Sequence, residues 1–294
     1  MVDGVEFYVT ECENVMPPEA TPFDSPKESF RACTVLVSFA RSGAERAALQ
    51  PLRHALTFGQ TSSEVCGGSD WLQKLPKRLL ARLEAPKHDL VTIVVCAGSD
   101  GDLDAETVQA AADSLRQCFG DSLAALLVVA DISSHRFDSV QRVSGFVVGA
   151  SGTNAETARS VFLCLSMLLA PKTFTGMDLV DLLPIFDGAR KPTVLATALW
   201  LRDGDGRLVF ASDSDIQAVR CAPHVVAFPF FAGPSGWTEL HRVCKAIRDE
   251  VDESARMIYF AGDGAISPGT LSSRVCIVPI LCGNAKEVGI RVGL

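Results

Sequence analysis

The most chemically suggestive segment is the loop from Gly98 to Asp104, which lies between a continuous apolar run and a helical pattern. Gly98 and Gly101 would allow the backbone to approach a bound group closely. The same loop carries carboxylates at Asp100, Asp102 and Asp104. Without a neutralising metal, three carboxylates within roughly 10 Å would repel an anionic ligand such as a phosphate by several kcal/mol at intermediate dielectric. The competing interpretation is an acidic turn that caps the following helix.

A second candidate is the pair of carboxylates in the segment Thr175-Gly-Met-Asp178-Leu-Val-Asp181. Carboxylates are a residue type that can act as general bases. The alternative is structural, because Thr175 or Asp178 is a good N-cap for a helix that begins here. The motif alone leaves both interpretations open.

A third candidate is the turn Gly149-Ala-Ser-Gly152-Thr153, which joins a short strand to a long helix. Such a turn can bind a phosphate or a cofactor at the helix N-terminus. It has neither the Lys of a P-loop nor the third Gly of a dinucleotide fingerprint. Thr153 and Glu156 have capping-box spacing, which favours a tight turn with a helix cap. An α/β enzyme or cofactor-binding protein that uses this turn is the alternative function.

Apolar runs that alternate with helical patterns must position these loops. The pattern predicts strands at 34–39, 90–96, 123–130 and 146–149, and helices at 43–56, 71–83 and 105–119. Continuous apolar strands are typical of a parallel sheet that is covered on both faces. The first half is therefore predicted to be a doubly wound α/β domain.

The rest of the chain begins with a helix, 155–169, that is apolar on nearly all sides and should be buried. Strands at 193–201, 225–231, 257–261 and 274–282, a hairpin at 203–206 and a helix at 237–251 predict an α+β domain. The predicted division is an irregular segment at 1–30, a nucleotide-binding-like domain at 31–152, a central helix at 153–170 and a C-terminal domain at 171–294.

This order of elements resembles that of the tubulin/FtsZ superfamily, over roughly residues 32 to 285. The strand that ends in Ala-Gly98 stands where the family has a strand followed by the loop Gly-Gly-Gly-Thr-Gly-Thr-Gly. The resemblance implies phosphate contacts from Gly98, Ser99, Gly101 and Thr107, and from Gly43 in the family's first glycine-rich loop. Most of the signature glycines are replaced, and the hairpin at 203–206 stands where the family usually has more helix.

The resemblance also gives Asp178 and Asp181 a role. In the family, the loop after the long helix enters the nucleotide pocket of the next subunit, where its carboxylates polarise the attacking water. Both carboxylates are present here, while the glycines that hold the nucleotide are mostly absent.

The resemblance therefore implies a divergent FtsZ/tubulin-like protein with an eroded GTP site. We expect weak or lost GTP binding, no required cofactor, and at most weak GTPase activity. Such a chain would be a filament component or a filament partner. It would associate head-to-tail with itself or with another FtsZ/tubulin-type subunit.

Composition excludes several other classes. The 294 residues carry a formal charge of −8 and no basic run, so nucleic acid is not an expected partner. The longest apolar stretches are far shorter than the roughly 20 residues that a membrane span needs. The ten cysteines contain no CxxC pair and the five histidines have no metal spacing, which predicts reduced core thiols and no metal site. With no signal peptide apparent, the expected location is cytoplasmic.

Overall fold

The computed structural model describes residues 4–14, 30–39, 42–50, 62–67, 90–97, 105–130, 143–168, 192–202, 206–231, 237–260 and 275–283. It also describes Leu52, Lys77, Leu182, Ile185 and Phe186. All structural statements below concern these residues.

The strands are β1 (Gly4–Asn14), β2 (Phe30–Ser38), β3 (Ser62–Gly67), β4 (Leu90–Cys96), β5 (Leu123–Val129), β6 (Gly145–Gly149), β7 (Thr193–Leu201), β8 (Arg207–Phe210), β9 (His224–Ala227), β10 (Phe230–Phe231), β11 (Arg256–Tyr259) and β12 (Val275–Gly283). The helices are α1 (Gly43–Leu49), α3 (Ala105–Phe119), α4 (Asn154–Leu168), α6 (Asp213–Cys221) and α7 (Trp237–Arg248), with a 3₁₀ turn η2 (Gly120–Ser122).

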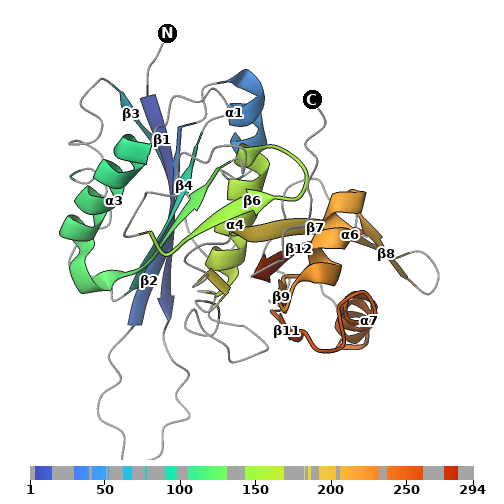
Figure 1. Cartoon of the computed structure of the whole chain (residues 1–294). Coiled ribbons are helices and arrows are strands. Elements are labelled where there is room, and N and C mark those ends of the chain that lie inside the picture. Colours follow the sequence, from blue (N-terminus) through green and yellow to red (C-terminus); the bar gives the residue numbers. More distant parts are fainter. Residues whose placement is uncertain are drawn as a thin grey trace, which may run out of the picture.

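One 12-stranded sheet runs through the molecule in the order β11-β9-β12-β7-β6-β5-β4-β2-β1-β3, with β10 beside β12 and β8 beside β7. Strands β2, β4, β5, β6 and β7 are mutually parallel. On one side β12 runs antiparallel to β7 and β9, and on the other β1 runs antiparallel to β2 and β3. The sequence prediction of a parallel α/β half, a central helix and a mixed half is confirmed (Figure 1).

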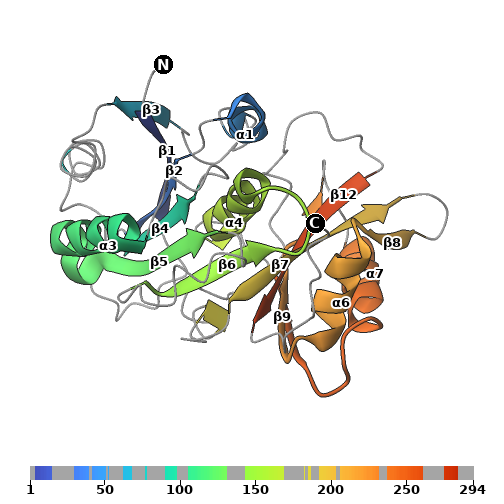
Figure 2. The same ribbon diagram turned by 45° about the horizontal axis from the view of Figure 1, so that its top comes forward.

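Helices cover both faces of this sheet, as Figure 2 shows. Helices α1 and α4 share a buried core with one face of β2, β4, β5 and β6. Helix α3 packs on the opposite face of β2, β4 and β5, and α6 and α7 pack on that same side over β7, β9 and β12. Apolar side chains on both faces of one parallel strand explain the continuous apolar runs of the sequence. The parallel half is therefore doubly wound.

Helix α4 is the buried central helix that the sequence predicted. It contacts β2, β4 and β6 on one side and α1 on another. Its residues from Val161 to Leu168 are all buried, so an apolar surface on nearly every side has a partner. The predicted hairpin is also present, since β7 and β8 pair antiparallel and Gly206 has φ +81°. The β6–β7 ladder joins the two halves, and the predicted division into domains stays a prediction.

The prediction of an irregular segment at 1–30 is wrong for residues 4–14. They form β1, which pairs with β2 from Glu6↔Ser38 to Asn14↔Phe30. The side chains of Tyr8 and Val9 are fully buried. The prediction gave too much weight to the prolines farther along, whereas the apolar and aromatic residues at 5–9 favour a strand once a neighbouring strand is available. Strand β3 and helix α6 were not predicted, and the helix expected at 71–83 lies outside the described residues apart from Lys77.

Candidate functional site

The candidate site lies at the edge of the sheet where the parallel strands end. Because β2, β4, β5 and β6 point the same way, the turns that follow them start side by side. The ladder continues one residue beyond the strands: Phe39 N donates to Cys96 O at 3.0 Å and Ala97 N donates to Val129 O at 2.9 Å. This is the edge at which open α/β sheets bind ligands.

The first turn at this edge is closed by a capping box. Ser42 Oγ accepts a hydrogen bond from Glu45 N at 3.1 Å. In return, Glu45 Oε2 accepts from Ser42 N at 3.4 Å and from Ser42 Oγ at 3.0 Å. The Glu45 side chain is almost fully buried. The carboxylate of Glu45 therefore occupies the N-terminus of α1, the place where a helix would otherwise attract an external anion.

The charge of Glu45 also acts on the end of β4. The pKa of the Cys96 thiol is raised to about 12, mainly by burial and then by the negative charge of Glu45, while a hydrogen bond with Ser38 lowers it. The thiol stays protonated at neutral pH, so Cys96 is not a nucleophile.

The turn after β6 is closed in the same way. Glu156 Oε2 accepts from Thr153 N at 2.8 Å and from Thr153 Oγ1 at 3.1 Å, and Glu156 N donates back to Thr153 Oγ1 at 3.3 Å. The capping box that the sequence predicted is confirmed. One residue farther, Asn154 Nδ2 donates to Ala97 O at 3.3 Å, which ties the start of α4 to the turn after β4.

Both glycines of the turn 149–153 are explained by its geometry. A Cβ at Gly149 would overlap Thr157 Oγ1, and Gly152 has φ +84° with its would-be Cβ 2.9 Å from Glu156 Oε2. A side chain at either position would strain the turn whether or not a ligand binds there. The glycines therefore give no independent support to a cofactor site, and the Glu156 carboxylate lies against the turn.

The side chain of Arg159, in α4, joins this helix to α1. Arg159 Nη1 donates to Ala48 O at 2.8 Å, in the last turn of α1, where a positive charge complements the helix dipole. Burial lowers the pKa of Arg159, and the nearby charge of Glu156 acts in the opposite direction. Arg159 therefore serves the packing of α1 against α4.

The structure brings two of the predicted phosphate-contacting residues to the same edge. Gly43 is the first residue of α1, and Thr107 lies in the first turn of α3, the helix that follows β4. Gly98, Ser99 and Gly101 lie outside the described residues, as do Asp178 and Asp181, so their roles stay predictions.

Sequence reasoning missed Glu45, Asn154 and Arg159. The pattern Ser42-x-x-Glu45 is a capping-box signal that could have been found. The contacts of Asn154 and Arg159 join residues 57 and 111 positions apart, and no local pattern encodes them.

Two further properties bear on the chemistry. The described residues include no group of three or more His, Cys, Asp or Glu side chains that could hold a metal ion. Within the same part of the chain, every helix is too short or too polar to cross a membrane.

No protein-family model matches the sequence, and no curated relative matches it. Among solved structures, the chain is similar to FtsZ of M. jannaschii in an empty dimer, with 11% identity, 74% of this chain and 69% of that chain covered, and a TM-score of 0.45. A mutant of the same FtsZ is 11% identical, with 74% of this chain and 71% of that chain covered and a TM-score of 0.44. CetZ from Methanosaeta thermophila is 10% identical, with 74% of this chain and 67% of that chain covered and a TM-score of 0.42. Such likenesses concern the course of the chain, so the chemistry must be judged from the site itself.

Proposed function

We propose that this protein is a divergent FtsZ/tubulin-like filament component or filament partner whose GTP binding and hydrolysis are weak or lost. Its partner would be a second copy or another FtsZ/tubulin-type subunit, bound head-to-tail. Two lines of support come from the sequence: the order of elements and the retained pair Asp178 and Asp181. The order of strands and helices agrees with that expectation at the parallel sheet, the central helix α4 and the closing strand β12.

The observation that carries the nucleotide part of the proposal is the pair of capping carboxylates. Glu45 and Glu156 accept the hydrogen bonds of the turns at the starts of α1 and α4. A phosphate placed beside them would meet like charges that the fold already holds in position. At intermediate dielectric, two unit charges 4 Å apart repel by about 4 kcal/mol. That repulsion adds to the acidic composition of the loop 98–104.

The assembly part of the proposal is tested by sedimentation. An Asp178→Ala/Asp181→Ala variant should fold as the parent does and lose self-association, or binding to an added FtsZ filament. The control is Asp213→Ala/Glu253→Ala, which removes the same charge from two exposed positions of the mixed half. If the test variant assembles and binds as the parent does, the segment 175–181 is only a helix start and the filament proposal fails.

A further inference from the structure

The face of the sheet beneath helix α4 carries two hydroxyl groups side by side. Thr34 of β2 and Thr92 of β4 are register partners in the parallel ladder, so their side chains leave the sheet on the same face. Leu36 and Val94, two residues farther along each strand, belong to the buried core that includes α4. Both threonines are fully buried on this face. We call Thr34 and Thr92 the threonine pair.

Helix α4 is long enough to cover the threonine pair. It starts at the carboxyl edge, where Asn154 Nδ2 donates to Ala97 O, and its 15 residues span about 22 Å. Thr92 lies five residues before Ala97 along β4, a distance of about 17 Å. Because β6 and β7 are parallel, the helix between them runs back over the sheet, where it contacts β2 and β4. The second half of α4 therefore lies above the threonine pair.

Neither hydroxyl of the threonine pair has a hydrogen-bond partner within the part of the chain that the structure describes. The Oγ1 atoms of both residues are shielded from solvent and unpaired. Burying a hydroxyl without a partner is costly, and most buried polar groups of native proteins pair either with protein or with ordered water. Two unpaired hydroxyls on neighbouring strands therefore point to a shared partner.

The surrounding backbone explains why that partner is not a protein group. Strand β2 pairs with β1 and β4, and strand β4 pairs with β2 and β5, so the backbone groups beside the threonine pair are used in the ladders. Thr193 of β7 is the contrasting case, because its buried hydroxyl donates to Ile185 O, a carbonyl outside the sheet, at 3.0 Å. The fold thus satisfies a buried threonine where a free acceptor lies nearby, and the threonine pair has none among the described residues.

The side chains in the row of the threonine pair are small. This row of the sheet continues to Ala125 of β5, the register partner of Thr92. The next row toward the carboxyl edge consists of the larger side chains of Leu36, Val94 and Leu127. A row of Thr, Thr and Ala fills less volume beneath the same helix than a row of Leu, Val and Leu. The place is therefore both polar and less filled, which are the two conditions for an internal water molecule.

We propose that the threonine pair is the binding site of an internal water molecule beneath α4. A water molecule can donate two hydrogen bonds and accept two, so it can join hydroxyls that have no protein acceptor, and two partners are within the usual range of two to four. Neutral hydroxyls suit water better than a cation, and the described residues hold no group of metal-ligating side chains. The inference concerns the interior of each molecule and does not depend on the filament function.

A crystal structure of the parent protein tests the site directly. We expect a water molecule about 2.8 Å from the Oγ1 atoms of both Thr34 and Thr92. The control is Ser166→Ala, which removes a third buried and unpaired hydroxyl, on α4 itself. At 3.6 residues per turn, Ser166 lies about 120° around the helix from Asn154, so its side chain does not point toward the end of β4 as that of Asn154 does. The water should remain in this variant.

Urea denaturation tests whether the water is shared. Thr34→Val and Thr92→Val keep the shape of the side chain and remove the hydroxyl. Each should raise the equilibrium constant of unfolding about fivefold, as should Thr193→Val, which breaks a hydrogen bond between protein groups. The double variant Thr34→Val/Thr92→Val should raise it by less than the product of the two single changes, because both residues hold one water. Thr34→Ser keeps the hydroxyl and should keep the water.

Three results would overturn the proposed site. The first is a crystal structure of the parent in which no water lies within hydrogen-bond distance of both hydroxyls, a result that stands even if the valine variants fail to fold. The second is a gain in stability in both single valine variants, which would show that the hydroxyls are buried dry. The third is loss of the water in Ser166→Ala, which would place it on the helix instead of the threonine pair.

Discussion

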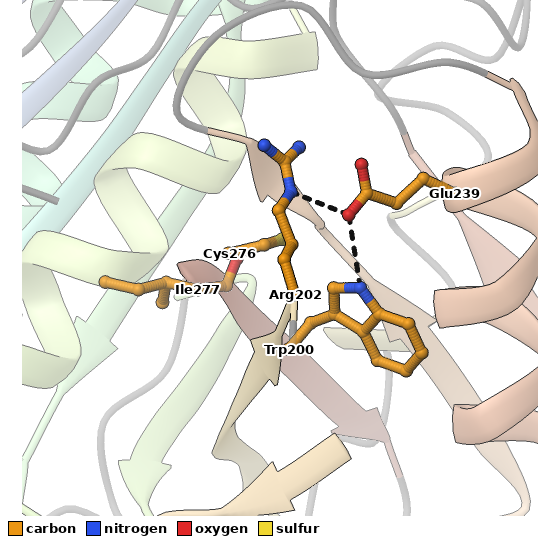
Figure 3. Close-up of polar contacts among 5 residues, drawn as sticks. All are labelled: Trp200, Arg202, Glu239, Cys276 and Ile277. Carbon is orange, nitrogen blue, oxygen red and sulfur yellow. Dashed lines mark hydrogen bonds and ion pairs between the residues drawn. The ribbon is translucent and has the colours of Figure 1, made fainter. Parts of the chain in front are cut away.

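The two halves of the sheet use carboxylates in different ways. In the parallel half, Glu45 and Glu156 each bond the N-cap of their own helix, three residues away. In the mixed half, Asp215 reaches Thr197 N on β7, 18 residues away, and Glu239 reaches Trp200, 39 residues away. Carboxylates in the first half thus close turns. In the second half Asp215 closes the turn at Ser212, the N-cap of its own helix, and also joins α6 to β7, while Glu239 joins α7 to β7 (Figure 3).

The difference is between hydrogen bonds within one helix cap and hydrogen bonds that join two elements of the fold. A capping box satisfies the first amides of a helix and leaves little there for an external anion. A carboxylate that spans two elements fixes their relative position, so its loss should cost more stability. We therefore expect the mixed half to respond to mutation mainly in stability, and the carboxyl edge of the parallel half mainly in ligand binding.

The largest effect should come from Asp215→Ala. Asp215 is fully buried and accepts from Thr197 N at 2.7 Å and from Ser212 Oγ at 2.6 Å. Without the carboxylate, a strand amide and a hydroxyl lose their acceptor in the core, which should lower the free energy of unfolding by about 3 kcal/mol. Urea denaturation measures the change. Asp213→Ala, at an exposed position of the same helix, should cost no more than about 0.5 kcal/mol.

A smaller loss is expected from Gly206→Ala in the hairpin of the mixed half. Gly206 has φ +81° and its would-be Cβ overlaps the Trp200 ring, so the substitution should cost about 2 kcal/mol. Gly43→Ala is the matched control at the carboxyl edge, because nothing lies within 4 Å of its would-be Cβ. Thermal unfolding should show Gly43→Ala unchanged or slightly more stable. Equal losses at the two glycines would remove the proposed difference between the halves.

The smallest effect should come from Glu239→Gln. The substitution keeps an acceptor for Trp200 Nε1 and removes the charge that faces Arg202. Since both side chains are partly solvated, we expect a loss of about 1 kcal/mol in urea denaturation. Asp249→Asn breaks the more exposed pair with Lys245 and should change stability by less than the error of the measurement. A larger loss of stability at Asp249 than at Glu239 would contradict the role of Glu239 in joining α7 to the end of β7.

Much of the fold could be predicted because its signals are local. The strand at 90–96 and the helix at 105–119 were predicted with their observed bounds. The first is a short apolar run rich in β-branched residues, which favours a strand, and the second has a 3.6-residue period, which favours a helix. Strand β1 was missed because its partner β2 lies beyond the proline-rich segment, and pairing depends on a contact distant in sequence.

The contacts at the candidate site and in the mixed half also fall into local ones, which the sequence indicates, and distant ones, which it does not. The cap formed by Thr153 and Glu156 was visible in the sequence, and Ser42-x-x-Glu45 carries the same signal. The reach of Asn154 to Ala97 and of Asp215 to Thr197 depends on how distant elements pack, which no short motif encodes. Sequence could therefore suggest where helices begin, but not which carboxylates join the elements.

Calorimetric titration of the intact protein with GTP and magnesium tests the central claim most directly. Glu45 and Glu156 fill the helix starts at the carboxyl edge, and the loop 98–104 adds acidic residues, so a triphosphate should find few free donors and strong repulsion. We predict no binding tighter than about 100 μM, roughly −5.5 kcal/mol. Binding with a Kd of a few micromolar would contradict the claim that the protein's own carboxylates have replaced the nucleotide at this edge.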